Sequence, residues 1–342
     1  MALGTPRVRA AVVGAGHMGQ YHGRVYAELW DVDLVGIVDI DPERAAAVAA
    51  HYDTAPYTDH RALIGRVDVV SVAVPTEQHF HVARDLLEAG VSVLVEKPIT
   101  PTLDEARELY AVARRAGAVL EVGHVERFNG AVQELRKIVE RPILVESRRL
   151  GPFVPRVQKD TVVMDLMIHD LDIVLALIDS PLERIAAAGA VVVSDAIDVA
   201  TVQLGFASGA IATITASRAT EEKIRTLAIT QPDAYIVLDY TDQDIQIHRR
   251  AAQEYTLNRE SIRYRQASFV EHLFVHRDNP LKLEIQHLIR SMQRRRAGEP
   301  VELAESDDVR SLAMALAIER MIRTGVPEDL LPPDLTWSKR SG

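Results

Sequence analysis

The chain contains no cysteine, which excludes disulfides, thiolate metal sites and a cysteine nucleophile. Its twelve histidines include no pair at the spacing with which one helix face presents two metal ligands, so we expect no metal site. No uninterrupted apolar run approaches the roughly 20 residues that span a bilayer. The amino terminus leads almost directly into an apolar strand and leaves no room for a signal peptide, so we expect a cytoplasmic protein.

Charge and length narrow the class of protein further. The formal net charge of -10 argues against a surface that binds nucleic acid over the whole protein. A length of 342 residues favours two domains, and we place their boundary between residues 124 and 125. Residues 1–124 would form the cofactor domain and 125–342 a substrate-binding and oligomerisation domain, whose last helices could pack back on the first.

Apolar strands and helices alternate along the first domain. Strands are expected at 7–13, 33–39, 67–74, 91–95 and 118–122, and helices at about 18–30, after Asp41-Pro42, at about 77–89 and from Thr102 to Gly117. This alternation predicts β-α-β units around a parallel sheet, that is, an α/β doubly wound Rossmann fold. The strands are apolar throughout, as expected when helices cover both faces of the sheet.

The second half of the chain has a different pattern. We expect a strand at 143–150, a helix at 160–178, and several strands rich in Val, Ile and Thr between about 185 and 248. Ala207-Ser208-Gly209 would form a hairpin turn, and further helices are expected at about 281–296 and 306–324. Successive strands without intervening helices predict a second α/β domain with a large, mostly antiparallel open sheet.

A glycine-rich turn follows the first strand. Gly14, Gly16 and Gly19 form G-x-G-x-x-G between a strand and a helix, the arrangement that lets the backbone approach a pyrophosphate. Asp39 ends the second strand 20 residues after Gly19, where a carboxylate would bind the adenosine ribose hydroxyls and repel a 2′-phosphate. Arg44 could weaken the resulting preference for NAD over NADP, but we expect its side chain on the exposed face of the following helix. The pattern therefore predicts NAD as the cofactor.

The ends of the other strands should line the same crevice, because ligands bind at the carboxyl edge of such sheets. The residues expected to contact the cofactor are Gly14, Gly16, His17, Met18, Gly19, Asp39, Pro75, Thr76, His79, Glu96 and Lys97. Most histidines near these segments, His22 among them, are expected to be turn or capping residues, whereas we place His124 in the cleft.

Two clusters carry the predicted chemistry. Lys97 directly follows a buried strand, so it would be partly desolvated and close to the nicotinamide. Asp165 and His169 are four residues apart on the expected helix, with Asp172 three residues beyond, so all three would share one face. A carboxylate one turn before a histidine can orient the imidazole as a base for a hydroxyl proton.

Three motifs occur in the order and spacing of the glucose–fructose oxidoreductase / inositol dehydrogenase family: Gly14-x-Gly16-x-x-Gly19, Glu96-Lys97-Pro98 and Asp165-x-x-x-His169. The resemblance to this family covers nearly the whole chain. The resemblance implies that Lys97 and the Asp165/His169 pair face the nicotinamide from opposite sides of a cleft. Lys97 would then polarise the reacting hydroxyl, His169 would be the general base, and Asp165 would position the substrate or His169. Which of Lys97 and His169 takes the proton stays open. The glycines often found before the Asp in that family are here Val162-Val163-Met164.

A more specific resemblance lies in residues 123–129 and in Asp165 to Asp170. These two segments resemble the UDP-N-acetylglucosamine 3-dehydrogenases of bacteria and archaea. This resemblance implies oxidation of the C3 hydroxyl of a nucleotide sugar to a ketone. The residues expected to bind substrate are His124, Arg127, Asn129, Arg148, Arg156, Asp165 and His169, with guanidinium groups suited to a diphosphate.

Two other functions stay open. One is a dehydrogenase of a free sugar or inositol, and the other is an NAD(H)-binding regulator without turnover, which would not need Lys97 or His169. The expected partner is a small-molecule substrate, with neither nucleic acid nor membrane. An open sheet face needs cover, and the resemblance implies homodimers, often paired into tetramers.

Overall fold

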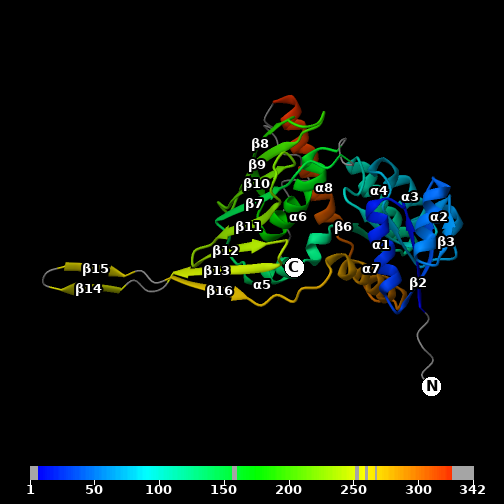
Figure 1. Ribbon diagram of the computed structural model, residues 1–342, viewed down its shortest axis with the longest axis horizontal. Coiled ribbons are helices and arrows are strands. Elements are labelled where there is room, and N and C mark those ends of the chain that lie inside the picture. Colours follow the sequence, from blue (N-terminus) through cyan, green and yellow to red (C-terminus); the bar gives the residue numbers. More distant parts are fainter. Residues whose placement is uncertain (1–6, 156–159, 251–253, 259–260, 266–267, 326–342) are drawn as a thin grey trace, which may run out of the picture. The chain divides into compact units, whose positions relative to one another are not determined.

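The computed structural model describes residues 7–155, 160–250, 254–258, 261–265 and 268–325 (Figure 1). The chain divides into two compact units, Met1–Phe128 with Asn279–Leu312 and Asn129–Asp278 with Ala313–Gly342. The first unit thus contains residues 1–124, expected as the cofactor domain, together with residues 125–128 and with residues 279–312 from the part of the chain whose last helices were expected to pack back on that domain.

The first unit is built on a six-stranded sheet in the order β3-β2-β1-β4-β5-β6, and every neighbouring pair is parallel. Its strands are β1 (Val8–Val13), β2 (Val32–Val38), β3 (Ala55–Tyr57), β4 (Val69–Val72), β5 (Ser92–Glu96) and β6 (Leu120–Gly123). The order reverses between β1 and β4, which opens the ligand crevice at their carboxyl ends. The predicted parallel sheet is confirmed; the short strand β3 was not predicted.

Four helices connect these strands: α1 (His17–Glu28), α2 (Pro42–His51), α3 (Thr76–Glu88) and α4 (Leu103–Ala116), with a short helix η1 (His60–Leu63) after β3. Local signals fix their ends. The Asp41 carboxylate accepts hydrogen bonds from the main chain of the first turn of α2, and the Thr102 hydroxyl does the same for α4. Gly117 ends α4 with a φ of 66°, a left-handed conformation that glycine adopts freely.

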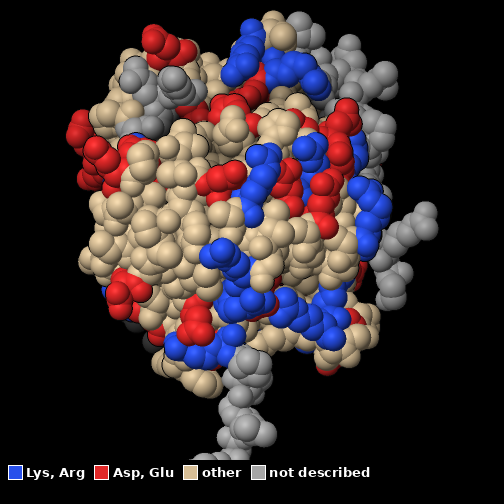
Figure 2. All heavy atoms as spheres, turned by 90° about the vertical axis from the view of Figure 1, so that its right-hand side faces the viewer, with Lys and Arg blue, Asp and Glu red and all other residues tan. Residues whose placement is uncertain are grey.

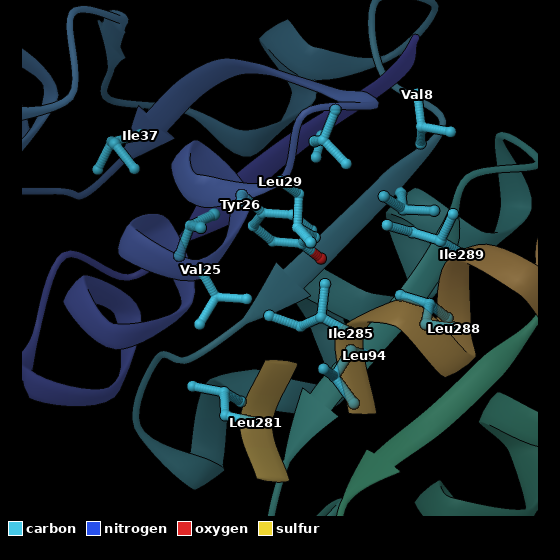
Figure 3. Packing of buried hydrophobic residues seen from close by; sticks show 14 of the residues in the cluster. Val8, Val25, Tyr26, Leu29, Ile37, Leu94, Leu281, Ile285, Leu288 and Ile289 are labelled. Carbon is cyan, nitrogen blue, oxygen red and sulfur yellow. The ribbon is translucent and has the colours of Figure 1, made fainter. Parts of the chain in front are cut away.

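Helix α7 (Pro280–Arg296) completes the core of the first unit. Its apolar residues recur every three or four positions, so they share one face. That face packs against α1 and the parallel sheet in a cluster that includes Tyr26, Leu29, Leu94, Leu281, Ile285, Leu288 and Ile289 (Figure 3). Each such side chain, when fully buried, stabilises the fold by about 1.5–3 kcal/mol.

The second unit is built on an eight-stranded sheet in the order β16-β13-β12-β11-β7-β10-β9-β8. Its strands are β7 (Leu144–Leu150), β8 (Leu182–Ala190), β9 (Val199–Phe206), β10 (Ile211–Ser217), β11 (Ile224–Thr230), β12 (Ala234–Asp239), β13 (Asp244–Arg250) and β16 (Ser268–Leu273). Only β7 and β10 pair in parallel. The predicted mostly antiparallel sheet and its β9–β10 hairpin are therefore confirmed. Strands β14 (Glu254–Asn258) and β15 (Ser261–Arg265) form a separate antiparallel pair.

The remaining helices are η2 (Val125–Phe128), α5 (Gly130–Ile138), the π-helix η4 (Val163–Met167), α6 (Ile168–Leu177) and α8 (Glu305–Thr324). Helix α5 was not predicted, although Asn129 before an amphipathic run is a helix-start signal. The side-chain oxygen Oδ1 of Asn129 accepts a hydrogen bond from Ala131 N at 3.1 Å and so caps the helix. None of the helices in the described ranges combines the length and apolar composition that crossing a bilayer requires. Acidic and basic side chains are interspersed over the molecular face that Figure 2 shows.

Candidate active site

The three glycines after β1 differ in what surrounds them. Gly14 has a φ of 101°, and a Cβ there would lie 2.4 Å from the Ala73 carbonyl oxygen. A Cβ at Gly19 would lie 1.7 Å from the Gly14 carbonyl oxygen, so the packing of the chain requires glycine at both positions. A Cβ at Gly16 would meet no described protein atom within 4 Å. The open backbone at Gly16 therefore leaves space at the start of α1, where a dinucleotide pyrophosphate fits.

The Asp39 carboxylate anchors this turn. Asp39 is 8% exposed and follows β2; its Oδ2 accepts a hydrogen bond from Ala15 N at 2.9 Å, and its Oδ1 accepts one from Asp41 N at 3.0 Å. Each oxygen keeps a lone pair for a ribose hydroxyl. Arg44 is half exposed, but its guanidinium lies 3.6 Å from Asp39 Oδ1 and 3.2 Å from Asp41 Oδ2. It is thus close enough to moderate the repulsion of a 2′-phosphate.

Helix α3 begins at the same edge of the sheet. Pro75 caps it and Thr76 is its first residue. The two ring nitrogens of His79 lie 2.9 Å from the carbonyl oxygens of Val74 and Pro98, so the ring links the segments that follow β4 and β5. Burial lowers the pKa of His79, against the effect of these two contacts. Because both ring nitrogens face the main chain, we propose that His79 shapes the crevice, and that the predicted cofactor contacts in this segment come from Pro75 and Thr76.

Strand β5 ends at Glu96, and Lys97 follows it at this edge. Glu96 is 9% exposed; its Oε1 lies 2.9 Å from His22 Nε2, and its Oε2 accepts from Lys97 N at 3.3 Å. Burial alone would raise the pKa of Glu96, but the His22 hydrogen bond and the charges of His22, Lys97 and His79 outweigh it, so that pKa is lowered. Lys97 itself is half-buried, and its peptide bond to Pro98 is cis.

Most histidines near the cofactor segments were expected to be turn or capping residues, and His22 is an exception. His22 is fully buried inside α1 and lies between Glu96 and Ser71. Its spacing from Gly19, one turn further along α1 and on the face toward the sheet, is the signal that could have shown this.

The second cluster lies in the other unit. The single α-helix expected over 160–178 is instead a π-helical segment, Val163–Met167, followed by α6. Asp165 lies in the π-helical segment and His169 in α6, so the α-helical argument that placed them on one face does not hold across this junction. Thr161 O accepts from Asp165 N at 2.9 Å, and Ile197 O accepts from Val162 N at 2.8 Å, which fixes the start of the segment. Both Asp165 and His169 are half-buried.

A buried ion pair holds α6 against the sheet. Arg149 in β7 and Asp170 in α6 are 2% and 0% exposed, with Arg149 Nε 2.6 Å from Asp170 Oδ2. A second hydrogen bond joins Arg149 Nη2 to Asp170 Oδ1 at 3.2 Å, and the guanidinium lies over the Tyr240 ring at 4.9 Å. The pair fixes the residue next to His169. Asp170 was not among the predicted site residues.

The structure separates Arg148 from this pair. Successive side chains of a strand point to opposite faces of a sheet, so Arg148 lies on the face away from α6, where it is exposed. The predicted role of Arg148 in substrate binding gains no support from this position. Arg156 lies outside the described residues.

The other predicted substrate ligands already have protein partners. Arg127 Nη2 donates to Asp308 Oδ1 at 2.6 Å, and the buried His124 has its Nε2 3.9 Å from the same oxygen. Asn129 caps α5, and its amide also donates to Tyr240 O at 3.0 Å, which occupies both ends of the side chain. His124 and Arg127 belong to the first unit and stay predictions.

Two family models match the chain. The model described as "Oxidoreductase family, NAD-binding Rossmann fold" matches residues 8–124, and a GFO/IDH/MocA C-terminal domain matches residues 129–236.

Several known proteins are similar to the chain. UDP-N-acetylglucosamine 3-dehydrogenase of Acidithiobacillus ferrooxidans is 38% identical over 246 residues, which cover 72% of this chain and 78% of that protein. A solved structure of UDP-N-acetylglucosamine 3-dehydrogenase from the same organism superposes with a TM-score of 0.82 at 33% identity, covering 94% of this chain and 99% of that one. An inositol 2-dehydrogenase of Acidothermus cellulolyticus is 30% identical over 191 residues, 53% of this chain and 56% of that protein.

Proposed function

The chain belongs to the oxidoreductase family with an NAD-binding Rossmann fold, and we propose that it oxidises the C3 hydroxyl of UDP-N-acetylglucosamine or a related nucleotide sugar. It is an NAD-dependent dehydrogenase that acts on a CH–OH group. The observation that carries the proposal is the carboxyl edge of the parallel sheet, along which the open backbone at Gly16, the buried Asp39 carboxylate and Lys97 follow the ends of β1, β2 and β5. The choice of a nucleotide sugar rests on the similarity to the Acidithiobacillus enzyme.

The protein groups have distinct roles in this proposal. Gly14, Gly16 and Gly19 let the main chain approach the pyrophosphate, and Asp39 binds the ribose hydroxyls. NAD, when bound at this edge, would supply the hydride acceptor for the carbon that carries the hydroxyl. Lys97 polarises that hydroxyl and His169 takes its proton, while Asp165 orients His169 or the sugar. Lys97 lies in the first unit and His169 in the second, so their action on one hydroxyl is a prediction.

The test mixes the purified protein with NAD and a panel of UDP-sugars, free sugars and inositols, and follows the absorbance of NADH. Turnover with UDP-N-acetylglucosamine supports the proposal, whereas turnover with inositols alone would replace it with the second function. Lys97→Met and His169→Gln should each lower kcat by about 10²–10⁴-fold. Lys137→Met, at an exposed lysine paired with Glu134, is the matched control and should leave kcat unchanged.

Unchanged NADH binding together with no turnover on any substrate would favour the regulator. The inositol 2-dehydrogenases among the relatives keep the free-polyol function as the main alternative. A diphosphate-bearing substrate predicts that UDP alone competes with the sugar, and a free polyol predicts that it does not.

We further propose that the protein is cytoplasmic and forms homodimers through the sheet of the second unit. The face of this sheet away from α6 carries the exposed side chains of Glu146, Arg148, Thr201 and Tyr235. A second copy is the expected cover for this face. Arg148→Glu should convert the dimer to a monomer in light scattering coupled to gel filtration; an unchanged mass would place the interface elsewhere.

A further inference from the structure

The start of the π-helical segment η4 (Val163–Met167) is held by hydrogen bonds to a single threonine. The hydroxyl oxygen of Thr161 accepts from Met164 N at 3.2 Å, and its main-chain carbonyl accepts from Asp165 N at 2.9 Å. The first N–H groups of a helix have no partner within the helix, so a residue that accepts from two of them acts as its cap. Thr161 therefore fixes the main chain at Asp165, the residue whose carboxylate the proposed function uses.

A residue far away in the sequence sets the direction of the Thr161 hydroxyl. Thr161 Oγ1 donates its proton to Glu319 Oε1, a carboxyl oxygen of α8. A hydroxyl has one proton and two lone pairs, so the proton given to Glu319 leaves the lone pairs for Met164 N. The Glu319 side chain is 12% exposed, and its Oε2 lies 3.8 Å from Arg323 Nη2. The cap of η4 is thus anchored in α8.

A second anchor comes from the residue after Thr161. Val162 N donates to Ile197 O at 2.8 Å, and the side chains of Val162 and Val163 are fully buried. Protein interiors are close-packed, so this stretch of main chain cannot shift without disturbing the core around the two valines. The start of η4 is therefore tied both to α8 and to the segment that precedes β9.

The turn that these anchors hold is an unusual one. Ile168 N donates to Val163 O, five residues earlier, whereas an α-helix would use the residue four positions earlier. Such π-turns are rare, occur mostly as single turns inside α-helices and are frequent at functional sites. Because a π-turn holds one residue more than an α-turn, a change to the ordinary α-helix would rotate Asp165 relative to His169. The anchors of η4 thus decide where the Asp165 carboxylate points.

We propose that Thr161 and Glu319 are positioning residues, which hold the π-turn of η4 and thereby set the direction of the Asp165 carboxylate. They act through the main chain of Met164 and Asp165 and not on the reacting atoms. The inference rests on the proposed function for its catalytic meaning, because that function has Asp165 orient His169 or the sugar. The hold on the turn itself can be measured without turnover.

The first test compares the turnover of UDP-N-acetylglucosamine with NAD in Thr161→Val and Thr161→Ser. Valine keeps the shape of threonine and lacks the hydroxyl, so Thr161→Val should lower kcat by about 10²-fold, the loss expected for a misplaced group, with an unchanged KM for NAD. Thr161→Ser keeps the hydroxyl and should restore most of kcat. Thr54→Val is the matched control, because Thr54 Oγ1 donates to Leu34 O at 2.6 Å in the first unit; its loss should lower the melting temperature and leave kcat unchanged. A wild-type kcat in Thr161→Val would overturn the inference.

A double-mutant cycle separates positioning from a general loss of structure. If Thr161 acts through Asp165, then Thr161→Val combined with Asp165→Asn should have the kcat of Asp165→Asn alone. Losses that multiply would show an effect that bypasses Asp165, and they would contradict the proposed role. Glu319→Leu is the second variant: it removes the acceptor and should lower kcat even if Thr161→Val does not fold. Glu319→Gln keeps an Oε1 acceptor and should stay close to the wild type.

Amide hydrogen exchange tests the hold on the turn with no sugar present. Peptides that span residues 162–168 should exchange about fivefold faster in Thr161→Val and in Glu319→Leu, the factor for a lost cap, and at the wild-type rate in Thr161→Ser. Unchanged exchange in the folded variants overturns the inference, whatever their activity. A wild type that oxidises no sugar overturns the proposed function instead, while the exchange still decides whether Thr161 and Glu319 hold η4.

Discussion

Glu284 offers a direct test of how the first unit treats buried charge. Its side chain is on α7 and is 1% exposed, and neither carboxyl oxygen has a hydrogen-bond partner among the described residues. Burial raises the pKa of Glu284 well above its ordinary value, and the nearby charges of Glu96 and Glu121 raise it further. Burial therefore favours the protonated, uncharged form of this carboxyl group in the folded protein.

The consequence for stability has a definite sign. Above pH about 4.3 the unfolded chain releases this proton, whereas the folded protein keeps it until the raised pKa is reached. In that window the folded state binds more protons than the unfolded state, so the free energy of unfolding falls as pH rises. One group contributes a slope of about -1.4 kcal/mol per pH unit. Glu284→Gln keeps the shape and cannot ionise, so it removes this contribution.

The measurement is urea unfolding followed by circular dichroism between pH about 5 and 8. The Glu284→Gln protein should gain stability over the wild type by an amount that grows with pH. Glu302→Gln, the same change at an exposed position, is the control and should follow the wild-type curve. A constant difference between Glu284→Gln and the wild type at every pH would refute the reasoning, because it would mean that the carboxyl group is ionised in the folded state or does not titrate.

Two further predictions test the site. Gly19→Ala should destabilise the protein by about 3 kcal/mol or more, because its Cβ would overlap the Gly14 carbonyl. Gly16→Ala should have the melting temperature of the wild type and bind NADH at least tenfold more weakly in a fluorescence titration. Equal effects of the two variants on melting temperature and on NADH affinity would contradict the placing of the pyrophosphate at Gly16. Asp170→Asn leaves the buried Arg149 guanidinium without its charge partner and should cost about 3–5 kcal/mol, seen as a lower melting temperature with unchanged NADH affinity in the folded protein.

Much of the fold could be predicted because its signals are local. The cap at Asp41, the cap at Thr102 and the left-handed Gly117 each depend on a few neighbouring residues, and the helices begin and end close to where these residues stand. Strand β3 was not predicted, because a strand of three residues with a central proline shows little apolar periodicity in the sequence. Helix α7 was expected as a helix, but its place in the core of the first unit depends on contacts with α1 that no local pattern encodes.

The site divides in the same way. The glycine turn, Asp39 and Lys97 follow from one topological rule, that parallel strands open their carboxyl ends onto a shared crevice. The π-helical segment was not predicted; the residue before it, Val162, donates its main-chain N–H to Ile197 O, more than thirty positions away, and no local pattern shows such a contact. Strand alternation alone, in contrast, could have shown that Arg148 and Arg149 point to opposite faces.

The buried polar residues show why composition is a poor guide to role. His22 and His79 are both buried histidines at the same sheet edge, yet the groups opposite their nitrogens differ. The nitrogens of His79 face two carbonyl oxygens and join two loops, whereas those of His22 face a hydroxyl and a carboxylate and so can transmit an orientation to Glu96. A carbonyl cannot change its charge and a carboxylate can. Of the two histidines, only His22 therefore has a hydrogen-bond partner that can carry a charge at this edge of the sheet.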